Sequence, residues 1–333
     1  MRLVRRLEEH WYRPGLVPLL LLPLAGLYCL AVLLRRGAYR MGLLASYRLP
    51  VPVVIVGNIT VGGTGKTPLV IWLAELLRQA GYRPGLVARG YRGRARNWPQ
   101  QVRPDSDPQV VGDEAVLLAR RCRCPMAVGP DRVAAARALL EHSDCDVILS
   151  DDGLQHYALE RDVEIAVIDG VRRFGNGHCL PAGPLREPRR RLAQVDLLVS
   201  NGPGLRLEYP MKMRLSAARR LGDPQVEQPL EQFRGRRVHA VAGTGNPQRF
   251  FSALHGIGIE VEPHPFPDHH EFGARDFDFG DGAPILMTEK DAVKCAQFGA
   301  VDRWYVPASA VPDERLGARI LALLEKRGAA AGG

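Results

Sequence analysis

The residues best suited to do chemistry in this 333-residue chain lie in a glycine-rich segment, GNITVGGTGKTP, at residues 57–68. This segment falls between a β-branched run at 52–56 and a helical pattern at 68–79, which is the context that a phosphate-binding loop requires. Glycines let backbone N–H groups turn toward phosphate oxygens, and the start of the following helix adds positive partial charge. Lys66 would reach the β- and γ-phosphates of a nucleotide, and the Thr67 hydroxyl would bind Mg²⁺. The residues expected to contact the nucleotide are Thr60, Val61, Gly62, Gly63, Thr64, Gly65, Lys66 and Thr67.

The loop departs from the strict pattern G-x-x-x-x-G-K-[ST] at one position. That pattern has glycine where this chain has Thr60, although Gly57, Gly62 and Gly63 lie nearby. A glycine-rich turn with an exposed lysine is the alternative. The Gly-Lys-Thr ending between a strand and a helix favours a variant phosphate-binding loop.

A pair of carboxylates follows a second apolar run, VILSDD, at residues 147–152. A phosphate-loop enzyme needs an acidic residue at the end of a neighbouring strand to hold a metal ion or its water molecules. Asp151 and Asp152 have this position. Aspartate is also common as a helix cap, so the pair in isolation would have a structural explanation. Beside a phosphate loop, metal binding is the favoured interpretation.

Apolar runs that alternate with helical patterns must position these groups. Strands that are apolar throughout and alternate with helices indicate a parallel sheet covered on both faces. We therefore expect an α/β fold with a P-loop NTPase-like core. The pattern weakens after residue 201, and a new alternation from 238 to a helix at 314–326 indicates a second, smaller α/β domain. The expected division is an N-terminal segment (1–48), a P-loop core domain (49–233), a smaller α/β domain (234–328) and a disordered tail (329–333).

The N-terminal segment contains twenty uncharged residues, GLVPLLLLPLAGLYCLAVLL, at 15–34. This is about the length that crosses a hydrocarbon core, so the segment is expected to meet lipid. Pro18 and Pro23 would interrupt a spanning helix, so a helix that lies in the membrane interface competes with a full crossing. Arginines on both sides leave the orientation open. A signal peptide is disfavoured because no small-x-small cleavage site follows.

The overall composition fits a folded protein with an anionic partner. Lysine and arginine number 45 against 36 acidic residues, a net charge of +9, and 46% of the residues are hydrophobic. This excludes a disordered or fibrous chain and favours a nucleotide, nucleic acid or acidic lipid as partner. No nucleic-acid recognition motif is present. The six cysteines form no C-x-x-C pair, which indicates reduced thiols.

Several further motifs occur in order along the chain and resemble those of the tetraacyldisaccharide 4'-kinase family. The resemblance implies transfer of the γ-phosphate of ATP, with Mg²⁺, to the 4'-hydroxyl of tetraacyldisaccharide 1-phosphate, forming lipid IV(A) in lipid A biosynthesis. It implies membrane lipids as further partners and a location at the cytoplasmic face of a Gram-negative inner membrane. No protein partner is inferred. The motifs are GNITVGGTGKTP (57–68), ARGYRG (88–93), GDE (112–114), SDDGLQH (150–156), LPAGPLREP (180–188), FPDHHEF (266–272) and TEKDAVK (288–294).

The resemblance also implies roles for a carboxylate and a histidine. A sugar hydroxyl is a poor nucleophile, so a group within hydrogen-bonding reach should accept its proton. By the resemblance Asp113 is this base and His269 is the partner that orients or tunes it, with His270 left open as the alternative. Without the resemblance, residues 112–114 would be interpreted as a helix cap.

Other matching residues are expected around the phosphates. Asp151 and Asp152 resemble the metal-binding acids, Glu114 could join them, and Gln155 could position phosphate or metal-bound water. Arg132, together with Lys66, would stabilise charge on the transferring phosphoryl group. A surface arginine is the alternative for Arg132.

The remaining matches concern the acceptor. Arg89 and Tyr91 follow the second expected strand, where ligands gather in a doubly wound sheet. The basic stretch at 172–191, including Arg186, could receive the lipid 1-phosphate. The motif at 288–291 has no assigned role beyond contacting ATP or closing the domains. His264, His269 and His270 lack the spacing of a metal-binding helix, so a joint metal site is not expected.

Two other classes of function compete with a lipid kinase. A membrane-tethered ATPase would use the same loop without an acceptor, and a nucleotide-binding module would lack catalysis. The second leaves the Asp151–Asp152 pair and the apolar N-terminus unexplained.

Overall fold

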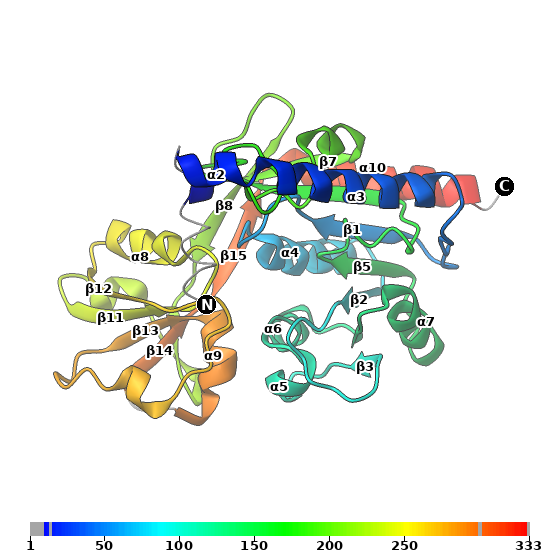
Figure 1. Ribbon diagram of the computed structural model, residues 1–333. Helices are drawn as coiled ribbons and strands as arrows, with labels where there is room; N and C mark the ends of the chain where they lie inside the picture. The colour runs from blue at the N-terminus through cyan, green and yellow to red at the C-terminus, as the bar shows by residue number, and fades with distance from the viewer. Residues whose placement is uncertain (1–9, 13–14, 299–301, 332–333) are drawn as a thin grey trace.

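The computed structural model describes residues 10–12, 15–298 and 302–331, and two sheets organise this part of the chain (Figure 1). The larger sheet has nine strands in the order β15-β8-β7-β6-β1-β5-β2-β4-β3. It is parallel except for its outer strands β3 and β15, which pair antiparallel with their neighbours. The strands are β1 (Val53–Gly57), β2 (Pro84–Ala88), β3 (Gln100–Gln101), β4 (Met126–Val128), β5 (Val147–Asp151), β6 (Val163–Asp169), β7 (Leu197–Asn201), β8 (Tyr209–Leu215) and β15 (Ala308–Pro312).

Helices cover both faces of this sheet because its strands are apolar on both sides. Val54 and Val56 of β1 pack into one core with α4, α6 and α10, while Val53 and Ile55 pack into another with α7. The expected P-loop core with a doubly covered parallel sheet is confirmed. The helices of this part are α4 (Lys66–Gln79), α5 (Pro108–Val111), α6 (Asp113–Cys122), α7 (Arg132–His142), the 3₁₀ helix η1 (Arg189–Gln194) and α10 (Glu314–Ala331).

The smaller sheet has six strands in the order β10-β9-β14-β13-β11-β12. Its centre is parallel, and β9 and β10 add antiparallel strands at one side. Its strands are β9 (Ala218–Arg220), β10 (Asp223–Gln228), β11 (Arg237–Ala242), β12 (Glu260–Pro265), β13 (Ile285–Thr288) and β14 (Arg303–Val306). Its helices are η2 (Leu230–Phe233), α8 (Pro247–Gly256), η3 (Ala274–Phe277), α9 (Glu289–Cys295) and η4 (Ala296–Phe298).

Sheet membership divides the chain differently from the expected boundary at residue 234. Strands β9 and β10 precede that boundary but belong to the smaller sheet, and β15 and α10 return to the larger one. We call residues 53–215 with 308–331 the first lobe, and residues 218–306 the second lobe. The two connections lie side by side, with Ser216 N donating to Pro307 O at 2.9 Å. The sequence pattern missed this return because β8 and β15 are not apolar throughout, as the buried strands are.

The C-terminal helix is longer than expected. The tail from residue 329 was expected to be disordered, but α10 continues to Ala331, since alanine has the highest helix propensity. Residues 332–333 lie outside the described part of the chain.

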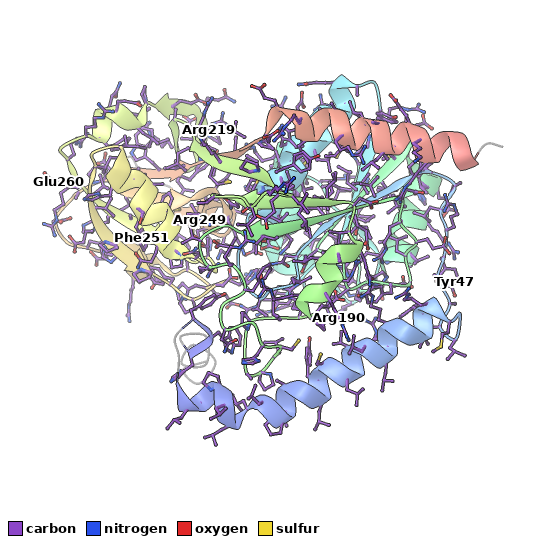
Figure 2. The ribbon with its side chains drawn as sticks, turned by 90° about the horizontal axis from the view of Figure 1, so that it is seen from above. Tyr47, Arg190, Arg219, Arg249, Phe251 and Glu260 are labelled. Atoms are coloured by element: carbon purple, nitrogen blue, oxygen red, sulfur yellow. The ribbon has the colours of Figure 1, made fainter. Side chains whose placement is uncertain are left out.

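The N-terminal segment forms α2 (Leu16–Leu20) and α3 (Leu22–Arg40), which lie along the outside of the first lobe. Figure 2 shows this helical segment running toward Tyr47, with side chains on its outer face pointing away from the rest of the molecule. Many of these are leucines, with Leu20 and Leu27 exposed by 78% and 65%. Within the described residues, no helix combines the length and the apolar character needed to cross a membrane. Arg2, Arg5, Arg6 and Arg13, expected as its basic flank, lie outside the described residues.

Candidate active site

The phosphate loop turns sharply into α4 at Gly65. Its φ of 97° lies in the left-handed region that glycine adopts without strain. Asn201 Nδ2 donates to Thr64 O at 2.9 Å, and a Cβ on Gly65 would lie only 2.3 Å from that nitrogen. The loop is therefore held from the end of β7 at a point where only glycine fits.

Thr60, at the start of the loop, was expected to contact the nucleotide, but it does not face the cleft. Thr60 is buried, accepts a hydrogen bond from Asn58 Nδ2 at 3.4 Å and forms a β-bridge with Leu185. The Val61 N–H donates to Pro184 O at 2.8 Å, so it is already used within the protein. Thr60 therefore packs against the 180–188 segment, and the cleft-facing part of the loop begins at Val61.

Lys66 lies between the loop and the carboxylate pair. Its Nζ is 3.2 Å from Asn58 Oδ1 and 3.4 Å from Asp152 Oδ1. Arg186 donates to both carboxylate oxygens of Asp152, at 2.9 and 3.1 Å. Burial would raise the pKa of Asp152, but the charges of Lys66 and Arg186 lower it below its usual range. Asp152 is thus held ionised, and Arg186 is its partner.

Asp151 ends β5 and has an unused oxygen. The side chain is 4% exposed, and its Oδ1 has no hydrogen-bond partner among the described residues. Burial raises the pKa of Asp151 to about 7, although the charge of Lys66 opposes this. Asp151 and Thr67 both line the cleft. An orphaned buried carboxylate oxygen in a cleft that a hydroxyl also lines fits a hard divalent cation that prefers oxygen ligands.

Arg132 and Gln155 are fixed by the protein on the same side of the cleft. Arg132, at the start of α7, donates through Nη2 to Asp152 O at 3.0 Å and is 5% exposed. Gln155 Nε2 donates to Glu187 Oε1 at 2.7 Å and to Asn58 O at 3.0 Å. The Gln155 amide nitrogen is therefore engaged with protein acceptors, while the Arg132 side chain lines the cleft.

Asp113 and His269 meet across the two lobes. His269 Nδ1 lies 3.0 and 3.1 Å from the two carboxylate oxygens of Asp113, which begins α6. Burial would raise the pKa of Asp113, but the hydrogen bond from His269 and the charges of Lys290 and Lys294 lower it to about 2. His270 instead pairs with Asp276 at 2.9 Å. The geometry therefore selects His269 as the partner of Asp113.

Glu114 pairs with a lysine that was not expected at the site. Its Oε1 lies 2.7 Å from Lys290 Nζ, which is also 3.0 Å from Asp268 Oδ1. Burial would lower the pKa of Lys290, but Glu114 and Asp268 raise it. Glu114 is thus paired with a lysine of the second lobe, and its charge also raises the pKa of Asp151, with which it lines the cleft. This pairing also suggests a role for the 288–291 motif, because Lys290 connects the two lobes beside His269.

A cleft of about 1540 Å³ lies between the lobes, and most of these residues line it, whereas Asp113 contacts the lining through His269. The lining includes Arg89 and Tyr91 from the first lobe, and the Tyr91 ring lies 5.2 Å from the His269 ring. Arg172 connects the lobes behind the loop by donating to Gly63 O at 3.0 Å and to Gly245 O at 3.2 Å. Sequence reasoning named the nucleotide side and the acceptor side separately, and the fold places both in one cleft.

The sequence analysis did not name some of the residues at the cleft as site residues. They share a signal, because several follow or end strands of the parallel sheet, where ligand-binding residues gather. Lys290 lies in a motif that was noted without a definite role. The missed residues that line the cleft are Arg172, Asn201, Gly245 and Lys290. Asn58 and Asp169 were also missed; they lie outside the lining and hold Lys66 and Arg172.

Comparisons with known proteins show the family to which the chain belongs. The family model described as tetraacyldisaccharide-1-P 4'-kinase matches residues 17–325. A tetraacyldisaccharide 4'-kinase from Nitrosococcus oceani is 59% identical over 318 residues, covering 96% of this chain and 94% of that protein. One from Alkalilimnicola ehrlichii is 53% identical, covering 91% and 92%. A crystal structure of LpxK from Aquifex aeolicus in complex with ATP superposes with a TM-score of 0.76 at 29% identity, covering 92% of this chain and 99% of that one. The chain therefore belongs to the tetraacyldisaccharide-1-P 4'-kinase family.

Proposed function

We propose that the cleft transfers the γ-phosphate of ATP to the 4'-hydroxyl of tetraacyldisaccharide 1-phosphate, with the His269–Asp113 pair as the proton acceptor. Membership of the family establishes an ATP-dependent kinase of lipid A biosynthesis, and the proposal concerns the roles of the residues. The observation that carries it is that the phosphate loop of one lobe and a histidine of the other line the same cleft. Such an arrangement can hold a nucleotide and an acceptor together while excluding water.

The proposed roles of His269 and Asp113 reverse the expectation from the sequence. His269 lines the cleft, whereas Asp113 lies behind it and outside the described lining. A carboxylate whose pKa is lowered to about 2 is a weak base. It is, however, suited to orient an imidazole and to stabilise it once protonated, as the carboxylate does in a Ser-His-Asp triad. We therefore assign proton acceptance from the 4'-hydroxyl to His269 Nε2 and orientation to Asp113.

The phosphate side of the cleft supplies positive charge. Lys66 and Arg132 would stabilise the charge that develops on the transferring phosphoryl group. Asp151, Asp152 and the Thr67 hydroxyl would hold Mg²⁺, which neutralises phosphate charge when bound. Arg186 holds Asp152, so we assign it this positioning role in place of the expected contact with the lipid 1-phosphate. Arg89 and Tyr91 remain the proposed contacts to the acceptor.

The proposed reaction is tested by following label from γ-labelled ATP. Purified protein in detergent is incubated with Mg²⁺ and tetraacyldisaccharide 1-phosphate, beside the Asp113→Ala variant. We expect the label to appear in the lipid with the wild type and to be reduced by at least about 100-fold in the variant, because loss of the aspartate that orients a catalytic histidine costs about 10⁴-fold in a Ser-His-Asp triad. Label found only in free phosphate, at equal rates with and without lipid, would contradict the proposal and support a tethered ATPase.

The exposed apolar face of α2 and α3 suggests how a lipid acceptor reaches the cleft. We propose that this face lies in the interface of the bacterial inner membrane, with both lobes on the cytoplasmic side. The segment is anchored to the site, since Tyr28 OH donates to Arg186 O at 3.1 Å and Arg35 Nη1 donates to Gln155 O at 3.2 Å. A membrane surface bound there would therefore lie beside the cleft, which Arg186 and Gln155 both line.

Replacement of Leu20, Leu27 and Leu34 by glutamine is expected to weaken binding to phosphatidylethanolamine–phosphatidylglycerol vesicles by at least about tenfold. Each fully buried leucine contributes roughly 1.5–3 kcal/mol, so even shallow burial of three gives this effect. Vesicle flotation measures it. Val110→Gln is the control, because this valine is 38% exposed and lies on α5, at the opposite end of the first lobe from α2 and α3 (Figure 1). Equal losses in both variants would argue against a specific membrane face.

A further inference from the structure

A second group of chemically active side chains lies in the second lobe, away from the cleft. His239 is on β11, and Glu262 and His264 are on the neighbouring β12, the outer strand of the six-stranded sheet (Figure 1). Within the described residues, none of the three lines the active-site cleft. The reaction proposed above makes no use of them.

The strand register places their side chains together. His239 is directly opposite Glu262 in the parallel pair, and His264 follows two residues later on the same face of β12. His239 Nδ1 lies 2.9 Å from His264 Nε2 and 3.8 Å from Glu262 Oε2. The ligand atoms of all three residues lie within 4.8 Å of one another. Two imidazole nitrogens and a carboxylate oxygen therefore lie close enough for one ion to contact all three, in place of the hydrogen that the two imidazoles share.

The surroundings orient the two imidazole rings. Asp281 Oδ1 lies 2.9 Å from His239 Nε2 and can accept its hydrogen, which leaves the lone pair of Nδ1 directed toward His264. Metal-binding histidines usually have such a carboxylate partner on the second nitrogen. The Phe279 ring stacks on both histidine rings with centroid distances of 4.1 Å. His239 is 2% exposed, so its orientation is fixed by packing.

We propose that His239, Glu262 and His264 bind a divalent transition-metal ion of the Zn²⁺ class. Two histidines and one carboxylate form a donor set that suits Zn²⁺ at roughly 2.0–2.2 Å from each ligand. Imidazole donors disfavour Mg²⁺, so this site is chemically distinct from the oxygen-lined site beside the phosphate loop. A bound ion would join β12 to β11 and, through Asp281, to the loop that precedes β13.

Arg237 competes with an ion at this site. Its guanidinium pairs with Glu262 Oε2 and lies 3.4 Å from Asp281 Oδ2. The Arg237 side chain is 59% exposed, so it can move into solvent when Glu262 turns to a metal ion. Removal of this arginine is therefore expected to strengthen metal binding, whereas loss of a merely structural ion pair would not.

Titration of the chelator-treated, full-length protein with Co²⁺, in the absence of nucleotide, tests the proposal. Co²⁺ reports nitrogen and oxygen ligands through its visible absorption, and Zn²⁺ should displace it. We expect one ion per chain. We expect His264→Gln and Glu262→Gln each to weaken binding by at least about tenfold, and Asp281→Asn to weaken it by roughly 10–100-fold. Arg237→Gln should tighten it severalfold. His142→Gln, an exposed histidine on α7, is the matched control.

Three results would overturn the proposed metal site. Binding that persists in His264→Gln and Glu262→Gln, or the absence of any binding at 100-fold excess of Co²⁺ over protein, would overturn the proposal. An intense near-ultraviolet band from thiolate ligands would do the same, because it would assign the ion to cysteines. Thermal unfolding of each apo variant shows whether it is folded. The test is independent of the kinase assay, since it measures metal binding alone.

Discussion

Replacement of His269 by glutamine is expected to lower kcat for lipid phosphorylation by about 10²–10⁴-fold, the range that general-base catalysis contributes. The KM for ATP should change little, because His269 approaches the cleft from the lobe opposite the phosphate loop. Glutamine retains a polar side chain of similar reach but cannot accept the proton. Steady-state kinetics with labelled ATP measure both constants.

The pairing of His269 with Asp113 makes a second result part of this prediction. Asp113→Asn should lower kcat strongly, and the double variant should be about as slow as the slower single variant, because residues that act as a unit have non-additive effects. His270→Gln is the matched control: His270 is the adjacent residue but pairs with Asp276 instead. Multiplicative losses, or an equal loss in His270→Gln, would contradict the proposed pair.

Replacement of Lys66 by methionine is expected to reduce kcat/KM for ATP by about 10²–10³-fold. The ammonium group lies between Asn58 and Asp152 at the start of α4, where a nucleotide's phosphates would meet the loop. Hydrogen bonds to charged groups contribute about 1.5–3 kcal/mol each, and Lys66 is proposed to make more than one in the transition state. Methionine preserves the apolar stem, so the change isolates the charge.

The control for Lys66 is a lysine outside the cleft. Lys326→Met, at an exposed position on α10, removes the same charge from the chain without touching the loop. It should leave kcat/KM within about twofold, as surface substitutions usually have small effects. A Lys66→Met enzyme with near wild-type kcat/KM would show that the loop binds ATP without this lysine.

Most of the larger sheet could be predicted from the sequence because each of its buried strands is recognised from a few consecutive residues. Each buried strand is a short apolar run, and the Gly-Lys-Thr ending lies between such a run and a helix, which fixes the position of the phosphate loop. The return of β15 to the first lobe could not be predicted in this way. It depends on pairing with β8, a strand almost a hundred residues earlier in the chain, and neither strand is apolar throughout.

The residues of the candidate site could be predicted from the sequence, but the pairs that they form could not. Asp113, His269, Lys66 and the Asp151–Asp152 pair stand in motifs. Sequence could not show that Glu114 pairs with Lys290, which is 176 residues away. Nor could it choose between the adjacent histidines: His269 has a φ of 60°, and this local turn directs the two side chains to different carboxylates.

The paired connection between the lobes determines how this enzyme can open. The chain leaves the first lobe after Leu215 and re-enters it at Ala308, and these two residues are partners in the β8–β15 ladder. The second lobe is thus an insertion whose covalent connection to the first lobe is one pair of hydrogen-bonded strands, and contacts across the cleft such as Glu114–Lys290 must break when it opens. Such a pair of strands bends and twists more easily than it shears, so substrate exchange is expected to follow one swinging motion about this pair. Truncation from the C-terminus would remove an outer strand and a covering helix of the first lobe before it shortened the second.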